Sequence, residues 1–235
     1  MRAILLAAGR GRRLGQDLPK TLLSIEGKTL LERHVVNLLE SGISALTIVV
    51  GYRKETIALA VERLHTSLPI ELVENPRYVH GSIVSLEVVA DRLANGGIWM
   101  DADVLYPAAL LRRLVTSKHA NCLLLDGRSE ESGEEMMVGT RGGRALKIAR
   151  RVGKEWDFAG ENVGFAKVGP EGGRVMKRIL DAEVDAGRLD QEYEAAMDRA
   201  FQEIAFGHER VDDFAWTEID FEEDVVKARK LARAL

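Results

Sequence analysis

The stretch "MRAILLAAGRGRRLGQDLPKTLL", residues 1–23, decides the fold. Its apolar run, residues 3–8, predicts a buried strand, and a loop rich in glycine and arginine follows and ends at Pro19 and Lys20. Glycines let backbone N–H groups converge on oxygen atoms that a Cβ would obstruct. The loop also concentrates positive charge, in Arg10, Arg12 and Arg13. A strand followed by such a loop predicts a site for a small anionic ligand, typically a phosphate.

Strand-like and helix-like segments alternate through the first half of the chain. The strand-like runs occupy residues 3–7, 45–51, 70–75, 97–103 and 121–127. The segments between them carry apolar residues at helical spacing, at 30–39, 57–64 and 83–93. This alternation predicts βαβ units with right-handed crossovers. We therefore expect a Rossmann-like α/β fold of three layers, α/β/α, with a mixed, mostly parallel central sheet.

The second half of the chain is less regular. Residues 136–150, "MMVGTRGGRALKIAR", predict a hairpin that turns at the Gly-Gly pair. A strand at 162–168, a helix from 170 to about 187 and a short strand at 216–220 follow. We expect these later segments to form a small insertion over the carboxyl ends of the parallel strands, where ligands bind in such sheets.

The composition excludes several classes of protein. The 235 residues carry 33 basic and 37 acidic side chains mixed along the chain, so no general basic field exists for nucleic acid. No run approaches the roughly 18 to 20 apolar residues of a membrane span. The single Cys122 excludes a disulfide framework within one chain. Arginines, and not a cleavage site, follow the first apolar run, so we expect a cytoplasmic protein.

Two familiar phosphate-binding motifs do not fit the opening loop. The dinucleotide fingerprint G-x-G-x-x-G has Leu14 in place of its third glycine, and the second strand lacks the acidic residue that binds ribose. A P-loop requires Gly-Lys followed by Ser or Thr, and no such tripeptide follows the first strand. The loop therefore belongs to another class of phosphate site.

The spacing of the loop resembles the signature of the nucleotidyltransferase superfamily. This superfamily includes the sugar-1-phosphate nucleotidylyltransferases and the phosphocholine-type cytidylyltransferases. An apolar strand is followed by Ala-Ala-Gly, a second glycine, Arg13-Leu14 and, after four residues, Pro19-Lys20. The resemblance implies that Arg13 and Lys20 are the catalytic cations. It also implies that the nucleotide is bound by Leu6, Ala7, Ala8, Gly9, Gly11 and Arg12.

Carboxylates at the predicted strand ends supply the acidic half of the site. In "IWMDADVLY", alternation along a strand predicts that Asp101 and Asp103 share one side. The resemblance implies that Asp103 and Asp220, in the C-terminal "WTEIDFEED", hold Mg²⁺, with Asp101 beside the nucleotide. Alternation also places Glu218 on the face of Asp220. Asp220 alternatively caps the closing helix.

Further residues are expected to contact the nucleobase and the acceptor. Gly81 and Ser82 match the pair that lies against the base in sugar nucleotidyltransferases. The resemblance assigns Lys154, Glu161 and Asn162 to the acceptor region. A choline-like ligand would want an aromatic cage, for which the chain offers Trp156, Phe158, Tyr193 and Trp216.

The resemblance implies Mg²⁺-dependent transfer of CMP from CTP to a small phosphorylated alcohol, with release of pyrophosphate. Phosphocholine, 2-aminoethylphosphonate and inositol 1-phosphate are the implied acceptors. We expect a single domain over residues 1–235, with a nucleotide-binding half (1–127) and an acceptor-binding half with the closing helix (128–235). A homodimer is compatible with these features.

Three alternatives remain open from the sequence. One is a sugar-1-phosphate nucleotidylyltransferase that uses UTP, GTP or dTTP on the same scaffold. The second is a glycosyltransferase, because residues 101–103 also form a D-x-D pattern. The third is a nucleotide-binding module without catalysis. The pair of Arg13 and Lys20 favours a reaction in which pyrophosphate leaves, because those cations would neutralise it.

Overall fold

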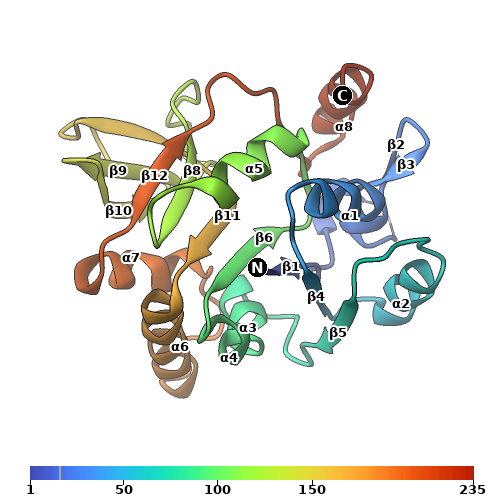
Figure 1. Cartoon of the computed structure of the whole chain (residues 1–235), viewed down its shortest axis with the longest axis horizontal. Coiled ribbons are helices and arrows are strands. Elements are labelled where there is room, and N and C mark those ends of the chain that lie inside the picture. Colours follow the sequence, from blue (N-terminus) through green and yellow to red (C-terminus); the bar gives the residue numbers. More distant parts are fainter. Residues whose placement is uncertain (16) are drawn as a thin grey trace.

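The computed structural model describes residues 1–15 and 17–235, without the side chain of Arg12. Its centre is a sheet of nine strands in the described part of the chain, with the order β10-β9-β11-β6-β1-β4-β5 and with β8 and β12 attached through β11 (Figure 1). The strands are β1 (Arg2–Leu6), β4 (Ala45–Val50), β5 (Ile70–Glu74), β6 (Gly97–Asp101), β8 (Cys122–Asp126), β9 (Met137–Arg141), β10 (Arg144–Ala149), β11 (Phe158–Val168) and β12 (Gly207–Arg210).

The directions of the strands confirm the predicted mixed sheet. Strands β5, β4, β1 and β6 are mutually parallel, and β11 runs antiparallel to β6, β8 and β9. Strand β12 is parallel to β8, and β10 is antiparallel to β9. All of these strands except β10 and β11 therefore run in one direction. The pair β9 and β10 is the hairpin that the Gly-Gly turn predicts.

Helices cover both faces of the sheet, as a three-layer fold requires. Alternate residues of β1 face opposite layers: Ala3 and Leu5 belong to one apolar cluster, and Ile4 belongs to the other. The first layer contains α1 (Leu30–Glu40), α2 (Lys54–Glu62) and α5 (Ala108–Thr116). The second contains α3 (Ser82–Glu87), α4 (Ala90–Leu93), α6 (Pro170–Asp185) and α7 (Glu194–Glu203). None of the described helices is long and apolar enough to cross a membrane.

The expected helix over residues 83–93 is two helices, α3 and α4. They are separated by Val88 and Val89, whose β-branched side chains lower helix propensity. This break leaves α3 as a short element beside the cleft described below. The difference concerns the continuity of the segment, because its apolar residues are buried as the pattern predicts.

A small third cluster fixes the opening loop and the C-terminal segment beside each other. The last helix, α8 (Glu222–Ala232), packs against the hairpin of β2 (Ser24–Ile25) and β3 (Lys28–Thr29). Two-residue strands β7 (Val104–Leu105) and β13 (Thr217–Glu218) pair antiparallel. Leu14, Ile25, Leu105 and Ile219 are buried together in this cluster. The short 3-10 helices η1 (Arg12–Leu14) and η2 (Lys20–Leu22) complete the connection from β1.

Helix α1 holds the segment that follows β6 through a buried histidine. The Nε2 atom of His34 lies 3.2 Å from the carbonyl oxygen of Ala102, and Nδ1 lies 3.2 Å from the Tyr106 hydroxyl. A carbonyl only accepts, so Nε2–H donates to Ala102 and Nδ1 accepts from Tyr106. Asn37, one turn later, donates to the backbone carbonyl of Tyr106. Burial lowers the pKa of His34 to about 4.

We expect this histidine to make stability depend on pH. The ordinary pKa is 6.5 and the folded value is about 4, so the unfolded chain binds the proton more readily between those values. The free energy of unfolding should therefore fall by roughly 2 kcal/mol between pH 7 and pH 5 from this residue, with no contribution above pH 7. Urea unfolding of the wild type and His34→Gln at both pH values measures the difference. Equal pH slopes in the two proteins would contradict the assignment.

Candidate active site

A cleft of about 330 Å³ lies at the carboxyl ends of the parallel strands. Strand β11 runs in the opposite direction, so its first half reaches the same end of the sheet. The cleft brings together most of the residues that the sequence nominated. Those that line it are Leu6, Ala8, Gly9, Arg13, Gly81, Ser82, Asp101, Asp103, Glu161, Asn162, Tyr193 and Asp220.

Four nominated residues do not line this cleft among the described contacts. Ala7 is buried, with its N–H donating to the carbonyl of Val49, and Gly11 and Lys20 are not among the described lining residues. Lys154 is exposed in the segment between β10 and β11 and is not among the described lining residues. The side chain of Arg12 lies outside the described residues.

The loop after β1 offers backbone N–H groups. Gly9, Arg10 and Gly11 donate no N–H hydrogen bond to any described residue. Gly11 has a φ of +61°, and a Cβ there would lie 2.8 Å from Cγ of Lys20. Glycine at this position thus allows both the left-handed turn and the passage of the lysine stem. This loop can present donors to an anion at the mouth of the cleft.

Lys20 joins the two aspartates that were expected to hold the metal. Its Nζ donates to Asp103 Oδ2 at 2.8 Å and also to Asp220. Burial lowers the pKa of Lys20, but the two carboxylates outweigh burial and raise it above its usual range. Arg13 donates to Asp220 Oδ2 at 2.9 Å, and its guanidinium lies over the ring of Phe221. The two cations therefore converge on Asp220.

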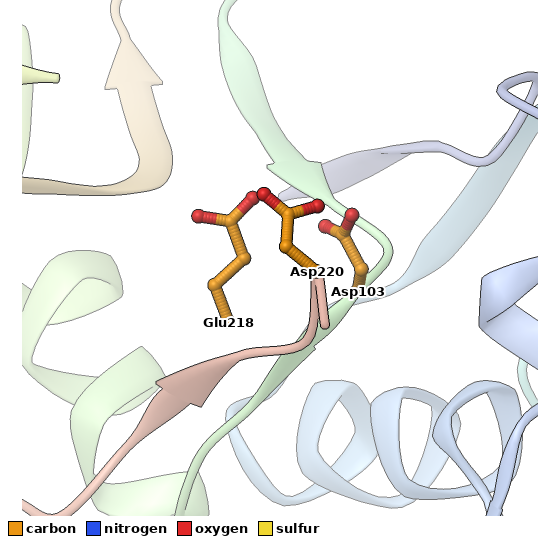
Figure 2. Close-up of side chains that lie close together, drawn as sticks. All are labelled: Asp103, Glu218 and Asp220. Atoms are coloured by element: carbon orange, nitrogen blue, oxygen red, sulfur yellow. The ribbon is translucent and has the colours of Figure 1, made fainter. Parts of the chain in front are cut away.

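Three carboxylates cluster beside this lysine. Oxygen atoms of Asp103, Glu218 and Asp220 all lie within 4.8 Å of one another, and Figure 2 shows the three side chains close together. Strand β7 pairs with β13, and the N–H of Ile219 donates to the carbonyl of Asp103 at 3.0 Å. These contacts bring the C-terminal acids to the end of β6. Glu218 keeps an exposed surface, yet desolvation by the surrounding protein and the negative charges of the two aspartates raise its pKa to about 9.

The chemistry of this cluster fits a hard divalent cation. Carboxylate oxygens are the ligands that Mg²⁺ and Ca²⁺ take in proteins. Glu218 adds a third candidate ligand to the pair expected from the sequence. Strand alternation placed it on the face of Asp220, but its distance to Asp103 depends on a pairing of two-residue strands that no local pattern reveals.

Asp101 has a separate environment in the cleft. Strand β6 ends at Asp101, so Asp103 lies beyond the strand and strand alternation is not what brings both to the cleft. Asp101 Oδ2 accepts from the Tyr193 hydroxyl at 2.8 Å. A Cβ on Gly164 would lie 2.2 Å from that oxygen, so glycine there leaves room for the carboxylate. Burial, together with Glu194 and Asp103, raises the pKa of Asp101 well above its usual range.

The wall formed by α3 carries neutral polar groups. Gly81 is the N-cap of α3, and a Cβ there would lie 2.0 Å from the carbonyl oxygen of Gln191. The small size of Gly81 therefore accommodates the loop before α7. Ser82 accepts the backbone N–H of Tyr193 at 2.9 Å and caps no helix. Tyr193 itself is 2% exposed, so it contributes an edge to the cleft and not an open aromatic face.

The wall formed by the start of β11 is acidic. Glu161 accepts from the hydroxyl of Ser129, and burial raises its pKa. Asn162 is 9% exposed, and its Oδ1 has no partner among the described residues. Glu134, Glu135 and Glu192 also line this side. The sequence did not nominate Arg150, which lines the cleft and donates to Glu192 at 2.7 Å.

Three of the four aromatic residues considered for a cage do not line this cleft, although Trp216 lines an adjoining hollow together with Glu161 and Glu218. The indole N–H of Trp156 donates to the carbonyl of Val152, and that of Trp216 donates to Asp126. Phe158 stacks on His208. None of these three lines the 330 Å³ cleft. Among the described lining residues, the large aromatic side chains are those of Tyr78 and Tyr193.

Comparison with known proteins gives a family and a fold. Residues 3–155, well over half of the chain, match the family described as "MobA-like NTP transferase domain". The chain is 28% identical over 232 residues to the "Bifunctional IPC transferase and DIPP synthase" of Thermococcus kodakarensis, covering 98% of this chain and 50% of that protein. It is 37% identical over 107 residues to the choline-phosphate cytidylyltransferase of Streptococcus pneumoniae, covering 44% of each. The chain thus spans about half the length of the curated relatives it matches.

Solved structures of similar architecture cover nearly the whole chain. The CTP:phosphocholine cytidylyltransferase from Streptococcus pneumoniae superposes with a TM-score of 0.81 at 24% identity, over 98% of both chains. The inositol-1-phosphate CTP transferase from T. maritima superposes with a TM-score of 0.77 at 19% identity, over 99% of this chain and 96% of that one. These likenesses confirm the Rossmann-like fold, and the family match confirms the resemblance of the opening loop: the chain belongs to the MobA-like NTP transferase domain family.

Proposed function

We propose that this chain is a nucleotidyltransferase that moves CMP from CTP to a small phosphorylated alcohol, in a Mg²⁺-dependent reaction that releases pyrophosphate. The observation that carries the proposal is the contact of Lys20 with both Asp103 and Asp220, next to a loop whose N–H groups at residues 9–11 donate to no described residue. Relatives that bear cytidylyltransferase names support the choice of CTP. Residues 1–127 and 128–235 would act together as one catalytic domain.

The opening loop would hold the triphosphate. The N–H groups of residues 9–11 and the guanidinium of Arg13 would bind the β- and γ-phosphates, where charge accumulates as pyrophosphate leaves. Lys20, held between its two aspartates, would neutralise the α-phosphate. The low exposure of the Lys20 side chain, 15%, strengthens its field because little water screens it.

The three carboxylates Asp103, Glu218 and Asp220 would hold Mg²⁺. When bound, that ion supplies charge neutralisation and orientation of the phosphate oxygens. Lys20 already supplies part of the compensating positive charge to two of these residues. Turnover should then require both the lysine and the carboxylates.

The chemical step needs no strong base from the protein. An acceptor phosphate has a second pKa near 6, so at neutral pH its oxygen is already a nucleophile. That oxygen would attack the α-phosphorus in line, form the new P–O bond and break the bond to the β-phosphate oxygen. Catalysis then rests on positioning and on charge neutralisation.

The acidic wall favours an acceptor that carries a cation. Glu161 has no ion pair with a described residue, and Glu134 and Glu135 also line the cleft, whereas Arg150 is paired with Glu192. Phosphocholine and 2-aminoethylphosphonate bear an ammonium group, whereas inositol 1-phosphate is uncharged apart from its phosphate. We therefore favour phosphocholine and 2-aminoethylphosphonate over inositol 1-phosphate as acceptors.

Replacing Glu161 by Gln should weaken binding of an ammonium-bearing acceptor. The substitution keeps the shape of the side chain and the bond from Ser129 but removes the charge that would face the cation. We expect the KM of the acceptor to rise about tenfold, equivalent to about 1.4 kcal/mol, with the KM of CTP unchanged. Steady-state kinetics with Glu171→Gln, an exposed residue on α6, as control would measure this. Equal rises for both substrates would argue for a general structural defect.

Pyrophosphate release across a matrix of substrates tests the proposed function. CTP, UTP, GTP and dTTP would each be combined with phosphocholine, 2-aminoethylphosphonate, inositol 1-phosphate and glucose 1-phosphate. We expect the largest signal with CTP and an ammonium-bearing acceptor. Release with UTP and glucose 1-phosphate would instead favour the sugar-1-phosphate reaction. That reaction is the main rival because one relative, 32% identical over 113 residues, is named a UTP–glucose-1-phosphate uridylyltransferase, from Haloferax volcanii.

A further inference from the structure

Ser85 is a buried serine on the neutral wall of the cleft, and its neighbours determine whether its hydroxyl donates or accepts a hydrogen bond from a ligand. Ser85 is 8% exposed and lies one turn after Ser82 on α3, and both line the cleft. Behind it lies Asn75, which is fully buried directly after β5. The Asn75 amide donates to the Ser85 oxygen at 3.0 Å. The two residues form a buried polar pair.

The backbone fixes the orientation of that amide. The N–H of Arg77 donates to Asn75 Oδ1 at 2.9 Å, and an N–H bonds only to the oxygen end of the amide. The N–H of Asn75 itself donates to the carbonyl of Val50 at 2.7 Å. The NH₂ end therefore faces Ser85. The serine oxygen accepts this proton and keeps its own O–H for another partner.

That O–H has no acceptor within the described part of the chain. Serines on helices often donate to the carbonyl four residues earlier, as Thr116 donates to Arg112, but Ser85 makes no such bond. The proton of Ser85 therefore finds no acceptor in the described part of the protein and is available to a molecule in the cleft, which Ser85 lines. A ligand that presents an acceptor atom to Ser85 would take this hydrogen bond.

The position of Ser85 in the cleft indicates which part of the ligand it meets. The loop after β1 and the carboxylate cluster are charged and suit the phosphates and the metal, and the start of β11 is acidic. The wall of α3 presents Gly81, Ser82 and Ser85, which are neutral. An uncharged heteroaromatic ring fits this wall best, and the oxygen of Ser82 is already engaged by Tyr193.

We propose that Ser85 reads the nucleobase, by donating its O–H to N3 of cytosine. The inference rests on the proposed function and adds a residue that selects the nucleotide. Cytosine presents an unprotonated N3 at the centre of its Watson–Crick edge, whereas uracil presents N3–H at the same place. A uracil there would leave the Ser85 proton without a partner, so CTP is preferred over UTP.

Titration calorimetry with nucleotides, in the absence of an acceptor substrate, tests the proposed contact between Ser85 and cytosine. The wild type and Ser85→Ala are each titrated with CTP, UTP and 3-deaza-CTP, in which a C–H replaces N3. We expect the wild type to bind 3-deaza-CTP about tenfold more weakly than CTP, and Ser85→Ala to bind CTP about tenfold more weakly than the wild type does. Ser85→Ala should show no further loss with 3-deaza-CTP. Ser24→Ala, on an exposed position of β2, is the matched control.

A second variant reverses the polarity of the pair. In Asn75→Asp, the N–H of Arg77 still finds an oxygen, but the other carboxylate oxygen accepts the Ser85 proton. The serine oxygen then turns its lone pair toward the cleft, and the affinity ratio of CTP to UTP should shift toward UTP. Thermal melting shows whether this variant is folded. If it is not, the test rests on the affinities of the wild type and Ser85→Ala for CTP and 3-deaza-CTP.

The outcomes separate this inference from the proposed function. Independent, additive losses from Ser85→Ala and from 3-deaza-CTP would overturn the role of Ser85 while leaving a CTP-dependent transferase intact. Equal affinities of the wild type for CTP and UTP would overturn it as well. Failure of every nucleoside triphosphate to bind would overturn both. Pyrophosphate release from CTP with an unchanged acceptor KM in Ser85→Ala would support both.

Discussion

Lys20→Ala should lower kcat by about 10²- to 10³-fold while the protein stays folded. The expectation follows from the size of the loss when one preorganised donor is removed from a site that stabilises developing negative charge. The ammonium of Lys20 is fixed by Asp103 and Asp220, so it costs little reorganisation when charge develops on the transferring phosphate. Alanine has no positive charge to replace the ammonium of Lys20.

The same variant should bind Mg²⁺ at least as tightly as the wild type does. Lys20 and the metal would share the carboxylates of Asp103 and Asp220, so removal of the ammonium leaves more negative charge for the cation. Metal titrations, followed by pyrophosphate release and by calorimetry, separate the two effects. A folding defect would weaken both metal binding and turnover, and thermal melting would reveal it.

Lys28→Ala is the matched control, because Lys28 lies eight residues later on the exposed hairpin strand β3. It should leave kcat and metal affinity unchanged. Turnover of Lys20→Ala within a few-fold of the wild type would remove the lysine from the mechanism and leave the opening loop with Arg13 as its main cation.

The elements that the sequence predicted well are those set by local patterns. The strand and loop of residues 1–15, the hairpin of β9 and β10 and the acids after β6 all carry their signals within about 15 residues. Burial of both faces of β1 and β4 follows from continuous apolar runs. The family resemblance then added Asp220, which local patterns would not connect to Asp103.

Features that depend on contacts between distant segments were not predicted. Glu218 reaches the carboxylate cluster through the pairing of β7 with β13, two strands of two residues each. The amide of Asn75, directly after β5, donates to the Ser85 oxygen and so leaves the Ser85 proton free for another acceptor. Conversely, Trp156 and Trp216 looked available for a ligand, but their indole N–H groups donate to the carbonyl of Val152 and to Asp126. Residue type alone does not reveal which partner a polar group finds.

Asp220→Asn should lower turnover by about 10²- to 10³-fold and raise the Mg²⁺ concentration needed for half-maximal activity. The change removes one negative charge from the cluster, and with it a carboxylate ligand and part of the field that holds Lys20 and Arg13. Asp103→Asn should behave alike, since Asp103 contributes a carboxylate to the same cluster.

The position of Asp220 lets this effect be distinguished from loss of a helix cap. The N-cap of α8 is Phe221, and Asp224 accepts the backbone N–H groups of both Asp220 and Phe221. The side chain of Asp220 is therefore not what caps the helix, so Asp220→Asn should melt within a few degrees of the wild type. Asp213→Asn, at an exposed ion pair with Arg113, is the control for a lost surface carboxylate.

The dependence on metal concentration decides what Asp220 does. If Asp220 holds the metal, excess Mg²⁺ restores part of the activity of Asp220→Asn, and Lys20→Ala in the same background adds less than its full single effect. If Asp220 acts only by holding Lys20, the half-maximal Mg²⁺ concentration stays at the wild-type value. That second result would leave Asp103 and Glu218 as the candidate ligands and would reassign Asp220 to the positioning of the lysine.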